Sequence, residues 1–380
     1  MNFLAWRDIR VNLMRFLLAA AGVGFLLTGC IGIIGLYRGI VHDALLTIDA
    51  IGADLWVVQG GRAGPFAEGS AVSATLDRRV EGIAGARHVR RFVQNNLQFR
   101  INGRVLRIAV TGLDFPKDRG EWLALSDGRM IQAARREVIA DASLGLPLGD
   151  VLRLGRDEYR VVGITSGLVD MSGDGMLFAT IPDAADIADT KPSEAVLLDR
   201  AQGLGPMADR PSRISAVILS VAPGADAAEV ARQIAAWGDV GVLTADQERE
   251  VLVNSRLWRL RLQILFFAIL LLTVTCVVIS MTMYNSTVEK LHQIAMLKLI
   301  GARDSFILSM ILQQALLIGV AAYVMAFGLA QLLFPYFPRH VELQPADLVM
   351  IFGGMLLACL LGSWFGIARA LRVGAKEVLA

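Results

Sequence analysis

The chain has 380 residues, of which 55% are hydrophobic and 19% charged, with a formal net charge of +2 and a mean hydropathy of +0.54. This apolar excess is larger than water-soluble globular proteins carry and indicates membrane-spanning segments. The nearly neutral balance gives no long-range attraction to nucleic acid.

Four apolar runs are each long enough to cross a bilayer, which takes about 20 helical residues at a rise of 1.5 Å each. None contains Asp, Glu, Lys, Arg or His, which argues against an ion pathway and against a secondary transporter, pump or channel acting alone. All three cysteines lie inside the runs, which excludes a disulfide framework outside the membrane. The predicted spans are residues 16–37, 262–284, 306–334 and 348–367.

Residues 1–15 alternate apolar side chains with Arg7, Arg10 and Arg15, which predicts an amphipathic helix in the headgroup layer. The alternative is the basic start of a cleaved signal peptide. The apolar run that follows continues past Cys30 and is too long for the hydrophobic region of such a peptide.

Residues 38–245 form the predicted extracytoplasmic domain, and their length fits one large unit or two small ones. Ile101-Asn102-Gly103 is a strong hairpin signal between two strand-like runs. Residues 182–213 contain four prolines and little periodicity, which predicts a surface excursion. Strands are expected at 54–58, 89–100, 104–113, 137–140, 151–154, 159–164, 176–181 and 214–221, and helices at 74–83 and 227–237, so the domain is mixed α/β.

Residues 246–284 show helical spacing with no Gly or Pro before the second span. The simplest structure is one stalk helix that is continuous with that span, and the alternative is a helix that stops at Arg261.

The segment 285–305 lies between spans two and three and carries mixed charges. Its apolar positions recur every three or four residues, which predicts a short amphipathic helix closed by Gly301. The candidate contact residues are Glu289, Lys290, Gln293, Ile294, Met296, Leu297, Lys298, Gly301 and Ala302.

Small residues recur at every fourth position of the last span and let helix backbones approach closely in lipid. They are Gly354, Ala358, Gly362 and Gly366, and span three shows Ala322, Ala326 and Ala330 in the same pattern. Four spans are few to enclose a path of any size, so two copies of the chain are expected to pair, although packing between spans of one chain explains the pattern equally well.

Basic residues near the span ends place both termini and the 285–305 segment in the cytoplasm. The same rule would also place the segment before the second span in the cytoplasm, because it carries Arg256, Arg259 and Arg261. These residues end a long domain, however, and long translocated segments largely escape the rule. Residues 335–347 then form a short external loop and 368–380 a cytoplasmic tail.

The sequence predicts no catalytic, cofactor or metal site. The phosphate-binding motif Gly-x-x-x-x-Gly-Lys-[Ser/Thr] is missing, and the four histidines share no metal spacing. The acidic stretch from Asp170 to Gly175 lacks the ligand pattern of a calcium loop, so a polar turn is expected.

The order of one span, a large outer domain and three spans resembles the FtsX/MacB-type permease family of bacterial ABC transporters. The 285–305 segment is similar to the family's Glu-Arg-x-x-Glu-Ile-Gly-x-Leu-Arg/Lys-x-Leu-Gly-Ala sequence, with Gln293 and Ala295 as departures. Residues 147–164 resemble the signature of the family's outer domain. The tail 370–379 resembles the usual chain end, with Gly374-Ala375 in place of Asp-Pro. The opening Leu-Ala-Trp and the later Gly-Ala-Asp-Leu-Trp-Val also look like the DevC branch, whose members export glycolipids with a membrane-fusion protein and an outer-membrane channel.

This resemblance implies a multi-pass protein of the bacterial inner membrane that binds a separate ABC ATPase dimer, which holds the ATP and Mg²⁺. It implies that ATP-driven movement enters at the 285–305 segment and reaches the outer domain. The expected partners are a second permease copy, membrane lipid, and a membrane-fusion protein with an outer-membrane channel. Three functions follow as hypotheses: export or extraction of a lipid, lipoprotein or other hydrophobic substrate; activation of a periplasmic partner such as a cell-wall hydrolase; and a passive scaffold. The size of the outer domain favours the first over the second.

Overall fold

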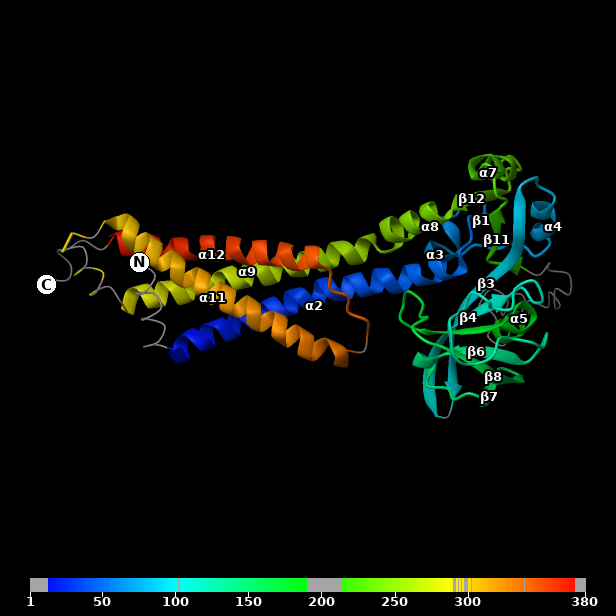
Figure 1. The fold of residues 1–380 in the computed structure, drawn as a ribbon, viewed down its shortest axis with the longest axis horizontal. Helices are drawn as coiled ribbons and strands as arrows, with labels where there is room; N and C mark the ends of the chain where they lie inside the picture. Colours follow the sequence, from blue (N-terminus) through cyan, green and yellow to red (C-terminus); the bar gives the residue numbers. More distant parts are fainter. Residues whose placement is uncertain are drawn as a thin grey trace, which may run out of the picture. The chain divides into compact units, whose positions relative to one another are not determined.

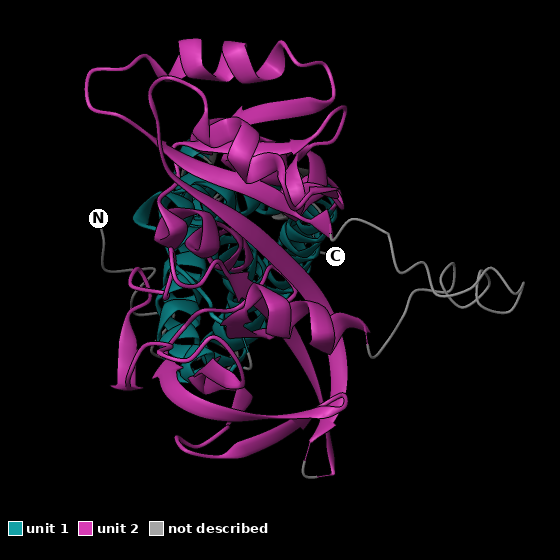
Figure 2. Ribbon diagram, turned by 90° about the vertical axis from the view of Figure 1, so that its right-hand side faces the viewer, with its two compact units in different colours: residues 1–39, 260–380 teal, residues 40–259 magenta. Residues whose placement is uncertain are grey.

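The computed structural model describes residues 13–372 apart from 102, 190–212, 290–291, 293, 295, 297–299, 302 and 338. The chain forms two compact units, residues 1–39 with 260–380 and residues 40–259 (Figure 2). Residues 1–12 of the predicted N-terminal helix and most of the predicted cytoplasmic tail lie outside the described residues, while residues 13–15 are the start of the first long helix.

Four long helices form the candidate membrane spans, as the sequence predicts (Figure 1). Each is apolar around most of its circumference, as lipid contact on one side and helix packing on the other require. Their bounds are α2 (Leu13–Ile51), α9 (Trp258–Glu289), α11 (Asp304–Leu333, followed by the short helix η3, Phe334–Tyr336) and α12 (Pro345–Arg372).

Helix α2 continues without a break past the predicted end of the first span at Tyr37 and crosses the boundary between the two units at residue 39. Gly52 ends it in the left-handed conformation, with φ +61°, and its N–H donates to Ile48 O at 3.2 Å. The extension carries buried Asp43 and Thr47 and lies outside the sequence-predicted span 16–37, whereas the candidate span in the structure is Phe16–Ile51.

The outer domain, residues 40–259, is built on a ten-stranded mixed sheet in the order β12-β1-β11-β3-β4-β9-β6-β8-β5, with β7 paired to β8. Strand β3 belongs to both halves of the sheet, because its first part pairs with β11 and its second part with β4. The bounds are β1 (Leu55–Gln59), β2 (Val72–Ser73), β3 (Ala86–Ile101), β4 (Arg104–Leu113), β5 (Leu125–Gly128), β6 (Glu137–Asp141), β7 (Val151–Leu154), β8 (Asp157–Thr165), β9 (Gly175–Thr180), β10 (Arg213–Ile214), β11 (Ala216–Val221) and β12 (Val240–Thr244).

The predicted hairpin is confirmed, since β3 and β4 are antiparallel and Ile101 pairs with Arg104. All eight predicted strand regions contain a strand, and both predicted outer-domain helices are present. Strands β2, β5 and β12 are additional to the prediction. The helices of the domain are α3 (Gly64–Ala67), α4 (Leu76–Glu81), the 3₁₀ turn η1 (Ala142–Leu144), α5 (Ile181–Asp189), α7 (Ala227–Ala235) and α8 (Ala245–Val251).

Helices cover both faces of the half of the sheet that contains β1 and β11. On one face, α4 and α7 contribute to a buried apolar cluster with these strands. On the other face, Trp56 of β1 contacts Phe66 of α3, with ring centroids 5.3 Å apart. Helix α8 lies beside α3 and also contacts β1 and β12 (Figure 1).

The stalk is divided where the sequence predicts an uninterrupted helix over 246–284. Helix α8 ends at Val251, a π-helical turn η2 (Leu252–Arg256) follows, and Leu257 is a bend before α9 begins at Trp258. No Gly or Pro marks this irregularity, so no sequence signal announces it. The alternative stop at Arg261 is not what the structure has, since α9 runs through that residue.

Candidate functional site

The predicted contact segment begins as the last turns of α9, which ends at Glu289. His292, Ile294 and Met296 are helical, and Gly301 has φ +96°, the left-handed conformation expected at the end of a helix. Five other candidate residues lie outside the described part of the chain: Lys290, Gln293, Leu297, Lys298 and Ala302.

Three described apolar residues near the end of this segment divide into two groups. Ile294 is only 1% exposed, because it packs against Ile307 and Ile311 of α11. Met296 is 49% exposed and Ile300 is 82% exposed. The segment therefore rests on its own chain through Ile294 and presents Met296 and Ile300 to the surroundings.

The small residues of α12 lie against α9 of the same chain. A Cβ atom added to Gly354 would lie 3.0 Å from Leu272 Cδ2, and one added to Gly362 would lie 3.1 Å from Cys276 O. Ala358 lies between these two glycines and is buried. Gly366 is part of α12, but its surroundings are outside the described part of the chain. The small-residue stripe thus serves packing within one chain and gives no separate argument for a second copy.

The other spans also approach through small residues. Added to Gly24 of α2, a Cβ would meet Ala322 O of α11 at 3.2 Å. Ala322, Ala326 and Ala330 are fully buried in the common core. Thr28 donates to Gly24 O at 2.8 Å, so its hydroxyl is satisfied within its own helix.

Charged groups in the first unit gather at the span ends. Arg38 donates two hydrogen bonds to Asp347 at the start of α12, with both N–O distances 2.9 Å. Such a bidentate pair fixes the relative position of α2 and α12 at this end. The four sequence-predicted spans themselves contain no Asp, Glu, Lys, Arg or His.

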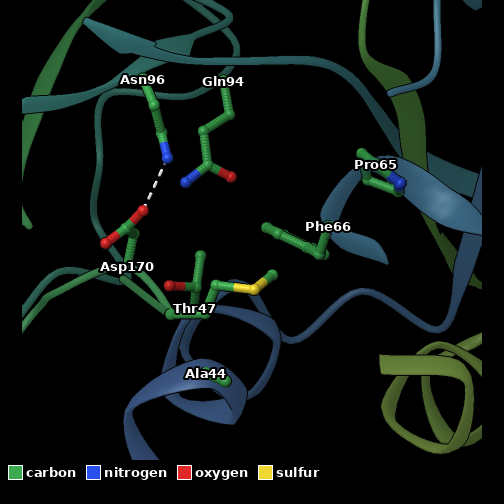
Figure 3. Close-up of a pocket in the computed structure, with 8 residues that line it drawn as sticks. Ala44, Thr47, Pro65, Phe66, Gln94, Asn96 and Asp170 are labelled. Carbon is green, nitrogen blue, oxygen red and sulfur yellow. Dashed lines mark hydrogen bonds between the residues drawn. The ribbon is translucent and has the colours of Figure 1, made fainter. Parts of the chain in front are cut away.

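A polar pocket of about 160 Å³ lies in the outer domain (Figure 3). Asn96 of β3 donates to Asp170 at 2.6 Å, and the side chain of Gln94 lies beside it. Thr47 of α2 and Phe66 of α3 complete its walls. The pocket is therefore a place where the extension of α2 meets the sheet through polar side chains.

The acidic stretch beginning at Asp170 is the polar turn that the sequence predicts. One carboxylate oxygen of Asp170 accepts from the N–H groups of Ser172 and Asp174, at 2.9 and 2.8 Å. Within the described residues there is no cluster of three His, Cys, Asp or Glu side chains that could hold a metal.

These features define a class of protein: a four-span membrane protein with a large mixed α/β domain between the first two spans. The family model for the FtsX-like permease C-terminal region matches residues 265–375, and that for the MacB-like periplasmic core domain matches residues 16–237. The chain therefore belongs to the FtsX/MacB-type family of ABC transporter permeases. A permease of this class implies an ATPase partner.

Curated relatives extend over the whole chain. Two uncharacterized ABC transporter permeases of Mycobacterium tuberculosis are 26% and 25% identical over 379 and 378 residues, which covers 98% of this chain and 97% of each relative. Among solved structures, the periplasmic region of MacB from Actinobacillus actinomycetemcomitans is 13% identical, with a TM-score of 0.37, covering 55% of this chain and 96% of that one. The extracellular domain of the transporter YknZ from Gram-positive bacteria is 15% identical, with a TM-score of 0.32, covering 50% and 99%.

Proposed function

We propose that this permease passes an ATP-driven conformational change from a separate ABC ATPase dimer, bound at the segment 285–305, to its outer domain. The transporter then exports or extracts a lipid, lipoprotein or other hydrophobic substrate outside the inner membrane. Both termini and the ATPase lie in the cytoplasm in this proposal, and a second permease copy and a membrane-fusion protein complete the assembly.

The observation that carries the proposal is the pair of exposed apolar side chains beside Gly301. Met296 lies in a helical turn and Ile300 in the turn before Gly301, and Ile294 on the same segment is already buried against α11. Exposed apolar groups on an anchored element are typical of a protein contact. The sequence-predicted spans support the same proposal, because without Asp, Glu, Lys, Arg or His they offer no ion pathway of their own.

The connections to the outer domain also support mechanical transmission. The domain is joined to the first unit by α2, which is helical across the boundary, and by α8, η2 and α9. Helical connections carry displacement better than flexible loops, because their backbone hydrogen bonds resist stretching and bending. Transmission also requires the ATPase to interact differently with the two states of the permease.

Met296→Glu tests the contact with the ATPase. A charge at a desolvated contact position costs about 2 kcal/mol or more, which is about a 30-fold loss of affinity. We expect weaker co-purification of the ATPase and loss of the permease-dependent part of ATP hydrolysis in nanodiscs. Phe337→Glu is the matched control, since Phe337 lies after α11 at its other end and is 50% exposed, compared with 49% for Met296. If the two variants bind the ATPase equally well, the contact role of this segment is wrong.

The substrate and the outer partners need a separate experiment. Mass spectrometry of the permease complex purified from membranes should recover a membrane-fusion protein and bound lipid. Recovery of a cell-wall hydrolase without lipid would instead support the signalling function, and recovery of neither partner nor ATPase would support a scaffold.

A further inference from the structure

Glu248 is a carboxylic acid in the interior of the outer domain. It lies on α8 and is 0% exposed. Within the described part of the chain, neither of its carboxyl oxygens accepts a hydrogen bond of standard geometry. A buried, unpaired carboxylate is strongly unfavourable, so the group is stable there only when it is neutral.

The carboxyl group is packed against the first residue of α3. An ideal Cβ added to Gly64 would lie 2.2 Å from Oε2 and 2.3 Å from Oε1 of Glu248. Gly64 also has φ +88°, a conformation that residues with a side chain rarely adopt. Position 64 is therefore a glycine for two reasons, and the Glu248 carboxyl forms one direct contact between α8 and α3.

Among the described residues, no charged side chain pairs with the Glu248 carboxyl. Strands β1 and β12 and helix α3 carry no titratable side chain. On α8 itself, Arg249 pairs with Asp49 and Asp246, while Glu250 is exposed. On η2 the single charged residue, Arg256, is also exposed.

Burial accordingly raises the pKa of Glu248 to about 7, although the backbone N–H of Phe66 acts in the opposite direction. The group therefore changes its charge near neutral pH, where an ordinary glutamate is fully ionised.

We propose that the protonated Glu248 carboxyl holds α8 against α3, and that loss of this proton releases the segment from α8 to Leu257. This segment, residues 245–257, is a proton-operated latch in the connection that leads to α9. The π-helical turn η2 and the bend at Leu257 fit this role, because irregular helical turns mark places where a helix rearranges. The latch itself does not depend on the proposed function, but any effect on transport does.

The sign of the effect follows from linkage. The closed state binds the proton more tightly than the open state, in which the solvated carboxyl has its ordinary pKa of 4.5. The closed state is thus most stable below pH 4.5, loses stability as pH rises to about 7, and changes little above that. Between pH 6 and pH 8 the equilibrium constant for opening rises about tenfold.

Hydrogen exchange of the full chain in nanodiscs measures this opening. After correction for intrinsic exchange rates, we expect the amides of α8 to open about tenfold more often at pH 8 than at pH 6. Glu248→Gln keeps the side chain neutral and nearly isosteric, so its α8 amides should stay protected at both values. Glu250→Gln, an exposed site on the same helix, should behave like the wild type.

Two results would overturn the latch: wild-type exchange in α8 that does not change with pH, or a Glu248→Gln variant with the same pH dependence as the wild type. Should the glutamine variant fail to fold, the wild-type titration alone decides. Because the measurement needs neither ATP nor a partner, its failure is distinct from failure of the proposed ATPase contact.

Discussion

Replacing Gly362 by alanine tests how closely α12 packs on α9. The added Cβ would lie 3.1 Å from Cys276 O, 3.1 Å from Ile279 Cγ2 and 3.2 Å from Ser280 N. Two of these atoms are backbone and cannot rotate away, so the helices must separate by a few tenths of an ångström. Overpacking of this kind costs about 1–3 kcal/mol.

Gly353→Ala is the matched control on the same helix, because nothing lies within 4 Å of a Cβ added there. Both substitutions gain about 1 kcal/mol of helix propensity, so the difference between them isolates packing. A thiol-reactive dye reports thermal unfolding in detergent, since Cys30 and Cys359 are buried in the bundle. If the packing cost is about 2 kcal/mol, the Gly362→Ala variant should melt about 4–8 °C below the Gly353→Ala variant. Equal melting temperatures would show that α12 does not press on α9 at this position.

Two further predictions concern the outer domain and the orientation of the chain. The guanidinium of Arg129 and two backbone N–H groups lower the pKa of Glu137 to about 2, so this carboxylate contributes stability above pH 4.5 that is lost as pH falls toward 2. Glu137→Gln should therefore lower the free energy of unfolding by about 1–2 kcal/mol at pH 7, once solvent screening is allowed for. It should also flatten the dependence of the melting temperature on pH between 5 and 2. A variant whose melting temperature falls with acid as the wild type's does would contradict this. For the orientation, single cysteines are introduced into a variant without native cysteines. A membrane-impermeant maleimide should label Arg104→Cys in intact spheroplasts and His292→Cys only after lysis. The reverse pattern would refute the cytoplasmic assignment of the 285–305 segment.

The spans and many strands could be predicted because their signals are local. Lipid requires about 20 consecutive apolar residues per helix, and the Asn-Gly turn with flanking β-branched runs fixes the β3–β4 hairpin. Helix α5 shows how such signals mislead, because the prolines of residues 182–213 predict a surface excursion that includes Pro182, and residues 190–212 of it lie outside the described part of the chain. In the structure Pro182 lies in the first turn of α5, where a missing N–H costs nothing.

The contact segment could be located from the sequence. Which of its apolar residues pack on the same chain and which are exposed to a partner could not be predicted. Periodicity places Ile294 and Ile300 among the apolar positions of one helix, yet it does not tell which of them meets the same chain. Ile294 is buried because α11 returns with Ile307 and Ile311 beside it, and that return is tertiary information. The division matters for experiments, since a charge at Ile294 would disturb this packing as well as any partner contact.

Glu248 could not be predicted at all, because in the sequence it lies within Asp246-Gln-Glu-Arg-Glu250, a pattern typical of a solvated helix surface. Its burial comes from Gly64, far away along the chain, whose missing side chain leaves the space that the carboxyl occupies. A passive connection between a domain and a span has no use for a buried, unpaired acid, since an apolar residue there would be more stable. In the proposed latch, the contact of α8 with α3 is stable only while Glu248 is protonated. The π-helical turn η2 lies between α8 and the second span. In a helix that must sometimes separate from its neighbour, a buried acid that weakens the closed state has a physical role.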